Sequence, residues 1–182
     1  SLLAIPTGLY AATRLAAMVA DEKARRWTPL YAAPVSRTRL AVGEIAVTTV
    51  GVVILHATAA LAIWAGAAIT GAPLTIGAAL EGALNTAPIA WLSVGAASLA
   101  VGWLPSAVGA IGALPVVGGF LLNVITQGMQ APTWVVNLSP FVHLPAVPNL
   151  PPDWATIATL TVIGAIMTAI GLAGYARRDL TT

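Results

Sequence analysis

The sequence contains no cysteine and very little charge. Its 182 residues include 8 Lys or Arg, 6 Asp or Glu and 2 His, so only 8 % are charged, against about 25 % in an ordinary soluble domain. Without cysteine the chain can form neither disulfides nor thiolate metal sites. The two histidines, His56 and His143, are too far apart in sequence to suggest a metal site. So few charges cannot cover the surface of a soluble domain of this size.

Hydrophobic residues make up 58 % of the chain, and the mean hydropathy is +0.90. The apolar runs are long and show no alternation with a period of two, which favours helices over a barrel. We therefore predict an all-α membrane protein, a polytopic transmembrane helix bundle in one domain. Segment 1–20 is expected to be the end of a truncated span, and the complete spans are predicted at residues 40–69, 76–103, 107–128 and 154–175.

Positive charge is absent from Leu40 to Ala176. The positive-inside rule therefore places the loop 21–39 and the tail 176–182 in the cytoplasm of a multi-pass plasma-membrane protein. Four spans between these clusters return the chain to the side that it left, which agrees with both clusters. The segment 129–153 is then extracellular. Its many prolines predict a broken, re-entrant segment.

Several catalytic motifs are also absent. The chain has no GxxxxGK[ST] phosphate loop, no GxSxG nucleophile elbow and no HExxH. It offers no nucleophile with a neighbouring base. We expect no enzymatic activity and no cofactor bound by this chain, and the sequence gives no reason to expect nucleic acid as a partner.

The third span carries Glu81 and Asn85 on one helix face, with Pro88 one turn later. A carboxylate inside a bilayer usually faces a cavity or a partner, and proline frees a backbone carbonyl. These residues could line a kinked translocation pathway, or Glu81 could be a buried acid that is hydrogen-bonded to its neighbours. His56, near mid-membrane, is another pathway candidate, and its alternative role is packing.

Other polar and small residues also leave alternatives open. Glu44 is expected to pair with Arg37 or Arg39 at the interface. Glycine and alanine stripes could pack helices within the bundle or form a seam between two copies. In the external segment, an interfacial belt over short helices competes with a gate on an exit path; its aromatic and histidine residues are Trp134, Phe141, His143 and Trp154.

The charged stretch 21–39 reads DEKARRWTPLYAAPVSRTR. Trp27, Leu30 and Tyr31 give one apolar side at helical spacing, and the prolines around them limit the length of a helix. Pro34 with Ser36 indicates a turn before the next span. The pattern is compatible with a plain cytoplasmic loop, or with a short helix held between two spans for docking to a protein.

This stretch, continued as LAVGE, resembles the first cytoplasmic loop of ABC transporter permeases of the type-2 exporter superfamily. The end GLAGYARRDLTT and the external LSPFVHLPAVP are also similar to that family, in the same order. Actinobacterial drug and polyketide-antibiotic exporters are the most similar in composition. One departure concerns the loop, where the family often has a glycine after its acidic residue and this chain has Arg25, Arg26 and Trp27.

The resemblance implies a permease, forming the C-terminal membrane part of an exporter for hydrophobic or amphipathic compounds such as drugs, antibiotics or lipids. Residues 21–36 would form a coupling helix docked on a separate ATP-binding subunit, which would bind ATP and Mg²⁺. A second permease half, as a homodimer or fused repeat, and membrane lipids are the other expected partners. The predicted coupling residues are Glu22, Arg25, Arg26, Trp27, Leu30, Arg37 and Arg39. The rival interpretation is a non-ABC membrane scaffold or a lipid-modifying membrane enzyme.

Overall fold

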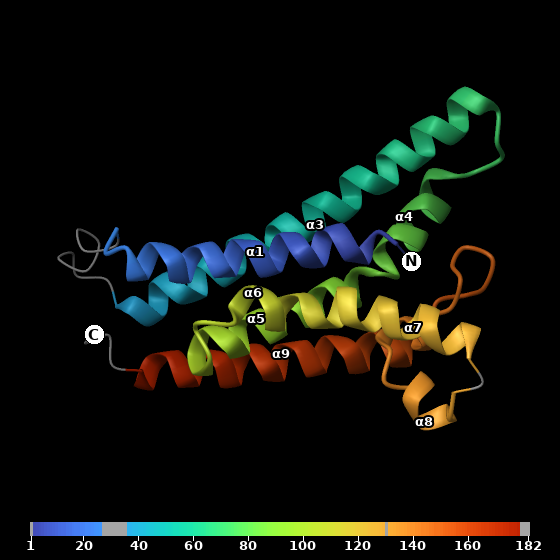
Figure 1. Cartoon of the computed structure of the whole chain (residues 1–182). Helices are drawn as coiled ribbons and strands as arrows, with labels where there is room; N and C mark the ends of the chain where they lie inside the picture. Colours follow the sequence, from blue (N-terminus) through green and yellow to red (C-terminus); the bar gives the residue numbers. More distant parts are fainter. Residues whose placement is uncertain (1, 27–35, 130, 179–182) are drawn as a thin grey trace.

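The computed structural model describes residues 2–26, 36–129 and 131–178. Within these ranges every regular element is a helix, which confirms the predicted all-α fold. Figure 1 shows the long helices running side by side, with the second half of α3 diverging from the others. The end of α1, the start of α3 and the end of α9 gather at one end of the bundle (Figure 1, left).

Four helical segments are long and apolar enough to cross a membrane. They coincide closely with the runs predicted from sequence, and the break in the third run divides it into α4 and α5. The helices, in chain order, are α1 (Ala4–Lys23), α3 (Arg37–Thr70), α4 (Ile76–Leu84), α5 (Ala87–Trp103), α6 (Val108–Ala113), the π-helical turn η1 (Leu114–Gly118), α7 (Gly119–Gly128), α8 (Thr133–Val136), the 3₁₀ turn η2 (Pro140–His143) and α9 (Trp154–Arg177).

Local sequence explains where α3 and α4 begin and end. The Ser36 hydroxyl accepts a hydrogen bond from the Arg39 backbone N–H, 3.3 Å away, and so caps α3. α3 ends where Gly71 adopts a left-handed φ of 73°, a conformation that glycine adopts without steric cost. Thr75 then caps α4 in the same way as Ser36 caps α3.

Proline interrupts two of the spans. Pro88 occupies the first turn of α5, where its missing N–H costs nothing, and α4 ends just before it at Leu84. Pro115 lies in the π-helical turn that joins α6 to α7. The predicted break near Pro88 is therefore real, and the fourth span has a comparable irregularity.

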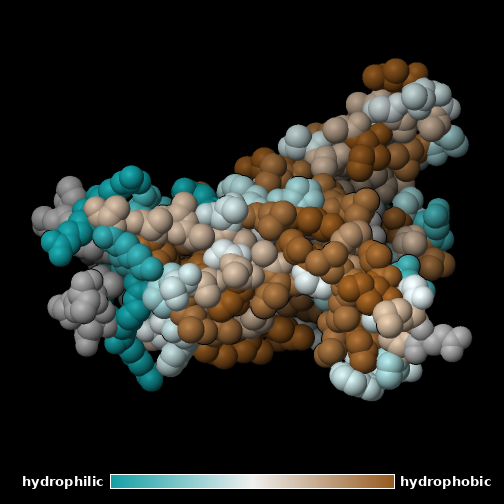
Figure 2. Space-filling model, viewed as in Figure 1, coloured by the Kyte–Doolittle hydropathy of each residue, from teal (hydrophilic) through white to brown (hydrophobic). Residues whose placement is uncertain are grey.

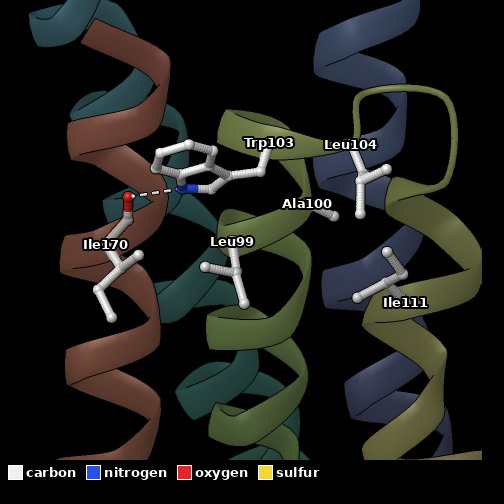
Figure 3. Close-up of a pocket in the computed structure, with 6 residues that line it drawn as sticks. All are labelled: Leu99, Ala100, Trp103, Leu104, Ile111 and Ile170. Carbon is white, nitrogen blue, oxygen red and sulfur yellow. Dashed lines mark hydrogen bonds between the residues drawn. The ribbon is translucent and has the colours of Figure 1, made fainter. Parts of the chain in front are cut away.

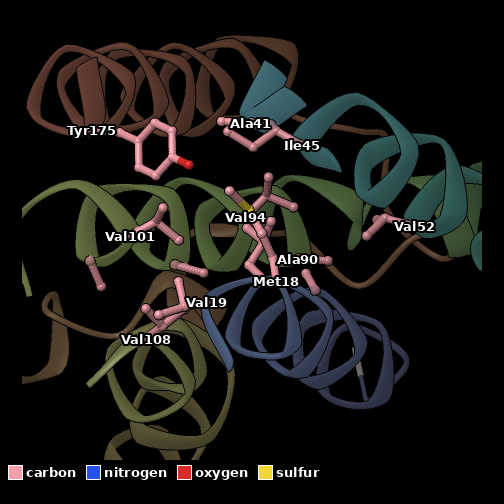
Figure 4. Close-up of a cluster of buried hydrophobic side chains, with 14 residues drawn as sticks. Met18, Val19, Ala41, Ile45, Val52, Ala90, Val94, Val101, Val108 and Tyr175 are labelled. Carbon is pink, nitrogen blue, oxygen red and sulfur yellow. The ribbon is translucent and has the colours of Figure 1, made fainter. Parts of the chain in front are cut away.

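The centre of the bundle is α5. The most apolar part of the α4–α5 span is 72 % buried, against 17–28 % in the other three spans. Figure 4 shows side chains of α1, α3, α6 and α9 meeting around α5. The cluster comprises Ala11, Leu15, Met18, Val19, Ala41, Ile45, Val52, Ala90, Val94, Ala97, Ala100, Val101, Val108 and Tyr175.

Glycines bring α5 and α9 into backbone contact. A Cβ atom at Gly102 would lie 2.1 Å from the Gly171 carbonyl oxygen, and one at Gly95 would lie 2.7 Å from that of Gly164. Small residues of this kind let helix backbones approach closely in lipid. These glycines therefore pack helices within the bundle, which was one of the two roles expected of the small-residue stripes.

The segment after α7 is fastened to the bundle by polar contacts. The Ser139 hydroxyl donates to the Gly119 carbonyl at 2.8 Å, and the Asn85 amide donates to the Pro145 carbonyl at 2.9 Å. Phe141 is buried and packs edge-on against Phe120, with ring centroids 5.9 Å apart. The predicted short helices are present here as α8 and η2, and Phe141 contributes to the core.

Asp153 caps the last span. Its carboxylate accepts hydrogen bonds from the Ala155 and Thr156 N–H groups at 3.1 and 3.2 Å, and from the Thr156 hydroxyl at 2.7 Å. The hydroxyl bond to Thr156 is the main reason why the pKa of Asp153 lies below its usual value of 3.8. The ionised form is therefore favoured in the folded protein.

We expect the contribution of this cap to stability to depend on pH. Because the folded pKa is depressed, the stabilisation is present above pH 3.8 and is lost as the pH falls through the folded value. Asp153→Asn can still cap the helix but does not titrate. In thermal unfolding in detergent from pH 7 to pH 3, the wild type should have a higher melting temperature than Asp153→Asn at neutral pH. This difference should decrease only at the acidic end of the range. A difference that is constant over this range would contradict the assignment.

Candidate functional site at the polar end of the bundle

Charged side chains concentrate at the end of the molecule where α1, α3 and α9 meet. The space-filling view shows hydrophilic residues gathered there and hydrophobic residues over most of the bundle sides (Figure 2). This end carries the described parts of the predicted loop, residues 21–26 and 36–39, together with Arg177 and Arg178.

Glu22, in the last turn of α1, turns into the protein. Its carboxylate forms an ion pair with the Arg178 guanidinium, and the Glu22 and Arg178 side chains are only 7 % and 20 % exposed. The buried Tyr175 hydroxyl donates to the other Glu22 oxygen at 3.0 Å. The predicted coupling residue Glu22 thus connects two helices of its own chain.

Arg178 makes further contacts at the same place. Its guanidinium donates to the Val101 carbonyl at 2.9 Å and lies 5.2 Å from the centre of the Tyr175 ring, within the range of a cation–π interaction. The Arg178 carbonyl accepts a hydrogen bond from the Arg37 side chain at 2.9 Å. We call Glu22, Arg37, Val101, Tyr175 and Arg178 the clasp.

The clasp joins the ends of four helices. Glu22 belongs to α1, Arg37 opens α3, Val101 lies near the end of α5, and Tyr175 lies in the last turn of α9 with Arg178 directly after it. Glu22 and Arg37 also lie on the two sides of the central part of the predicted coupling loop. A displacement of that loop would therefore act on the clasp from both sides.

Other predicted coupling residues remain on the surface. Arg25, Arg26 and Arg39 are exposed. Arg26 forms an ion pair with Asp21 at 2.6 Å, and such exposed pairs contribute little to stability. Trp27 and Leu30 lie outside the described residues, so their predicted contacts stay predictions.

Arg25 has an unusual backbone conformation. Its φ of 57° lies in the left-handed region, which costs residues with a Cβ about 1–2 kcal/mol. The similar exporter loops often carry glycine close to this point. The departure from the family pattern therefore falls at a position where the backbone favours glycine.

The predicted partner of Glu44 was wrong. Glu44 pairs with Arg14 of α1 at 3.0 Å, whereas Arg37 donates to the Arg178 carbonyl. Arg37 lies seven residues from Glu44, about 10 Å along the helix axis, and Arg39 lies on another face. The packing of α1 against α3 brings Arg14 closer than either.

The three pathway candidates lie in different surroundings. His56 is completely buried, with its Nδ1 atom 2.9 Å from the Val52 carbonyl. Asn85 is buried against Pro145, and Glu81 is exposed one turn away. Among the described residues no group of three or more His, Asp or Glu side chains could hold a metal ion. The transport roles of His56, Glu81 and Asn85 stay predictions.

Comparison with known proteins agrees with this architecture. A search of curated proteins found no match. A protein-family model described as "Multidrug efflux system permease Rv1217c, C-terminal domain" matches residues 1–176. Since the match covers nearly the whole chain, it confirms the resemblance to exporter permeases and indicates a membrane transport component rather than an enzyme. The chain belongs to the family of the C-terminal domain of the multidrug efflux system permease Rv1217c.

Proposed function

We propose that this chain is the permease part of an ATP-driven exporter and that a separate ATP-binding subunit docks on the loop 21–39. The observation that carries the proposal is the clasp, which links both sides of this loop to the ends of α5 and α9. Multidrug efflux in the family name agrees with an export role. With so few charges in its spans, the chain favours hydrophobic or amphipathic substrates.

In this mechanism the exposed loop residues and the two loop residues that belong to the clasp have different roles. The exposed cations Arg25, Arg26 and Arg39 provide charge for contacts with the ATP-binding subunit. Glu22 and Arg37 transmit the movement of the loop to the helices that they join. ATP binding to the partner favours one packing of the bundle over another, because a ligand shifts an equilibrium between two states by its differential affinity for them.

The topology follows from the same proposal. The clasp and the loop lie on the cytoplasmic side, where the ATP-binding subunit and its ATP and Mg²⁺ are found. The turn between α3 and α4 and the segment with α8 and η2 lie outside. A second permease half, either another copy or a fused repeat, completes the transporter.

The double variant Arg26→Glu with Trp27→Ala should abolish export and weaken binding of the ATP-binding subunit. It reverses the charge at one exposed loop residue and removes the aromatic side chain next to it. The measurements are export of a fluorescent drug from cells and co-purification of the subunit with the full-length permease. The amount of variant in the membrane should equal that of the wild type.

The conservative double variant Arg26→Lys with Trp27→Phe is the matched control. It keeps the charge and an aromatic ring, so it should retain most of the export and most of the co-purifying subunit. Undiminished export by the first variant would overturn the coupling role of the loop. Export without any ATP-binding subunit would favour a different class of membrane protein.

A further inference from the structure

An apolar pocket opens beside the clasp, on the side of the bundle. It has a volume of about 300 Å³, and its lining comes from α5, α6, α9 and the turn after α5. The lining residues are Leu99, Ala100, Trp103, Leu104, Ile111 and Ile170. Figure 3 shows these side chains around the space between α9 and α6, in front of α5.

The pocket is open to the surroundings of the helices. Trp103, Leu104 and Ile170 are each about half exposed, at 56 %, 55 % and 47 %. The Trp103 indole N–H donates a hydrogen bond to the Ile170 carbonyl at 3.2 Å. The rest of the indole ring, which is apolar, therefore lines the pocket. Because these helices are long and apolar enough to span a bilayer, hydrocarbon surrounds such an opening.

A positive charge lies close to this apolar space. Arg177 is exposed and follows Ile170 by seven residues, which places it on the same face of α9 about 10 Å further along. The contact between Arg178 and the Val101 carbonyl shows that this end of α9 lies beside the end of α5. Arg178 is held in the clasp, whereas Arg177 makes no ion pair with any other described residue.

We infer that this pocket is a binding site for one anionic phospholipid of the cytoplasmic leaflet. The end of one acyl chain occupies the space between α9 and α6, against Trp103 and Leu99, and Arg177 contacts the phosphate headgroup. The volume lies at the lower limit for small-molecule sites and suits part of one chain rather than a whole lipid. Trp at the membrane interface and Arg at the headgroup level match the usual preferences of these side chains.

The site has a consequence for the clasp. The lipid would contact α9 between Ile170 and Arg177, on the turns that carry Tyr175. It would also contact Trp103, two residues after Val101. An occupied pocket therefore supports the ends of α5 and α9, two of the four helix ends that the clasp joins, and does so independently of the ATP-binding subunit.

Native mass spectrometry of the full-length protein tests this inference. After partial delipidation in an equal mixture of phosphatidylglycerol and phosphatidylcholine, the wild type should retain one phosphatidylglycerol per chain. Ile170→Trp fills the pocket and should reduce this retention at least tenfold. Arg177→Gln should reduce the preference for the anionic lipid about fivefold, the effect of one basic residue near an anionic surface, and Arg177→Lys should preserve it.

Ile163→Trp is the matched control. Ile163 lies seven residues before Ile170 on the same face of α9, is 43 % exposed and does not line the pocket, so its variant should retain the lipid. Equal retention in Ile170→Trp and Ile163→Trp would overturn the site. A lipid preference that Arg177→Gln leaves unchanged would overturn the headgroup contact.

Two other occupants give different results. The 182 residues contain no cysteine, so Ile170→Cys provides a single thiol in a full-length protein whose other cysteines are replaced by serine; efficient cross-linking between two copies in the membrane would show that protein covers the pocket. Displacement of the retained lipid by rhodamine 6G, together with loss of rhodamine export in Ile170→Trp but not Ile163→Trp, would identify a substrate site. Either result overturns the lipid assignment. The cross-linking and the lipid displacement do not depend on the ATP-binding subunit, whereas the export measurement does.

Discussion

Arg178→Ala should destabilise the folded permease by about 3 kcal/mol, the lower part of the range for removing one partner of a buried ion pair. The reason is that the variant removes the arginine that pairs with the Glu22 carboxylate, which is 7 % exposed. It also removes the hydrogen bond to the Val101 carbonyl and the contact with the Tyr175 ring. The expected result is a clear decrease in the melting temperature of the purified full-length protein, accompanied by loss of export.

The neighbouring Arg177→Ala is the control for this prediction. This variant also removes an arginine side chain, at the preceding position, where the side chain is exposed and lies outside the clasp. The melting temperature of Arg177→Ala in detergent should stay close to that of the wild type. Equal melting temperatures for Arg177→Ala and Arg178→Ala would contradict the structural role of the clasp.

A double-mutant cycle separates the ion pair from the other contacts of Arg178. Glu22→Gln should also destabilise the protein, because it leaves the arginine charge without a partner in a largely buried position. Glu22→Gln combined with Arg178→Met removes both charges and should recover part of the stability. Strictly additive losses would show that the two side chains do not interact energetically.

The sequence predicted the membrane spans well because long apolar runs determine them locally. The run 154–175 became the helix Trp154–Arg177, and the break before Pro88 could be seen from proline alone. Ser36 likewise marked the start of α3 through its capping hydroxyl. Each of these features depends on residues within a few positions of one another.

The clasp could not be predicted in the same way. Glu22 and Arg178 lie 156 positions apart; the sequence predicted Glu22 as a coupling residue and Arg178 only as part of the basic tail, with no contact between the two. Their pairing depends on the close packing of α1, α5 and α9, which no local pattern encodes. The wrong partner for Glu44 has the same cause, because its arginine lies on a neighbouring helix instead of nearby in sequence.

In the external segment, too, the sequence predicted local structure but not long-range packing. Its prolines predicted short, broken helices, and α8 and η2 are present. The aromatic residues looked alike in sequence, yet Trp134 and Trp154 are 69 % and 71 % exposed whereas Phe141 is 7 % exposed. Phe141 is a core residue because it packs with Ala4, Ile89 and Val116 and lies edge-on against Phe120 of α7.

Gly102→Ala is expected to be among the most disruptive single-methyl changes at the described glycines. The added Cβ would lie 2.1 Å from the Gly171 carbonyl oxygen and 3.0 Å from the Tyr175 backbone nitrogen. Because both neighbours are backbone atoms, no side chain can move aside, and α5 must separate from α9. We expect a loss of about 3 kcal/mol, at the upper end of usual overpacking effects, measured by unfolding the full-length protein in mixed micelles.

Gly66→Ala is the matched control, since it adds the same methyl group to α3 where no heavy atom lies within 4 Å. Alanine favours a helix over glycine by up to about 1 kcal/mol, so this variant should be unchanged or slightly more stable. Equal unfolding curves for Gly66→Ala and Gly102→Ala would contradict the close α5–α9 contact. Since Tyr175 and Val101 adjoin that contact, Gly102→Ala should also weaken the clasp and reduce export while the loop residues 21–39 remain intact.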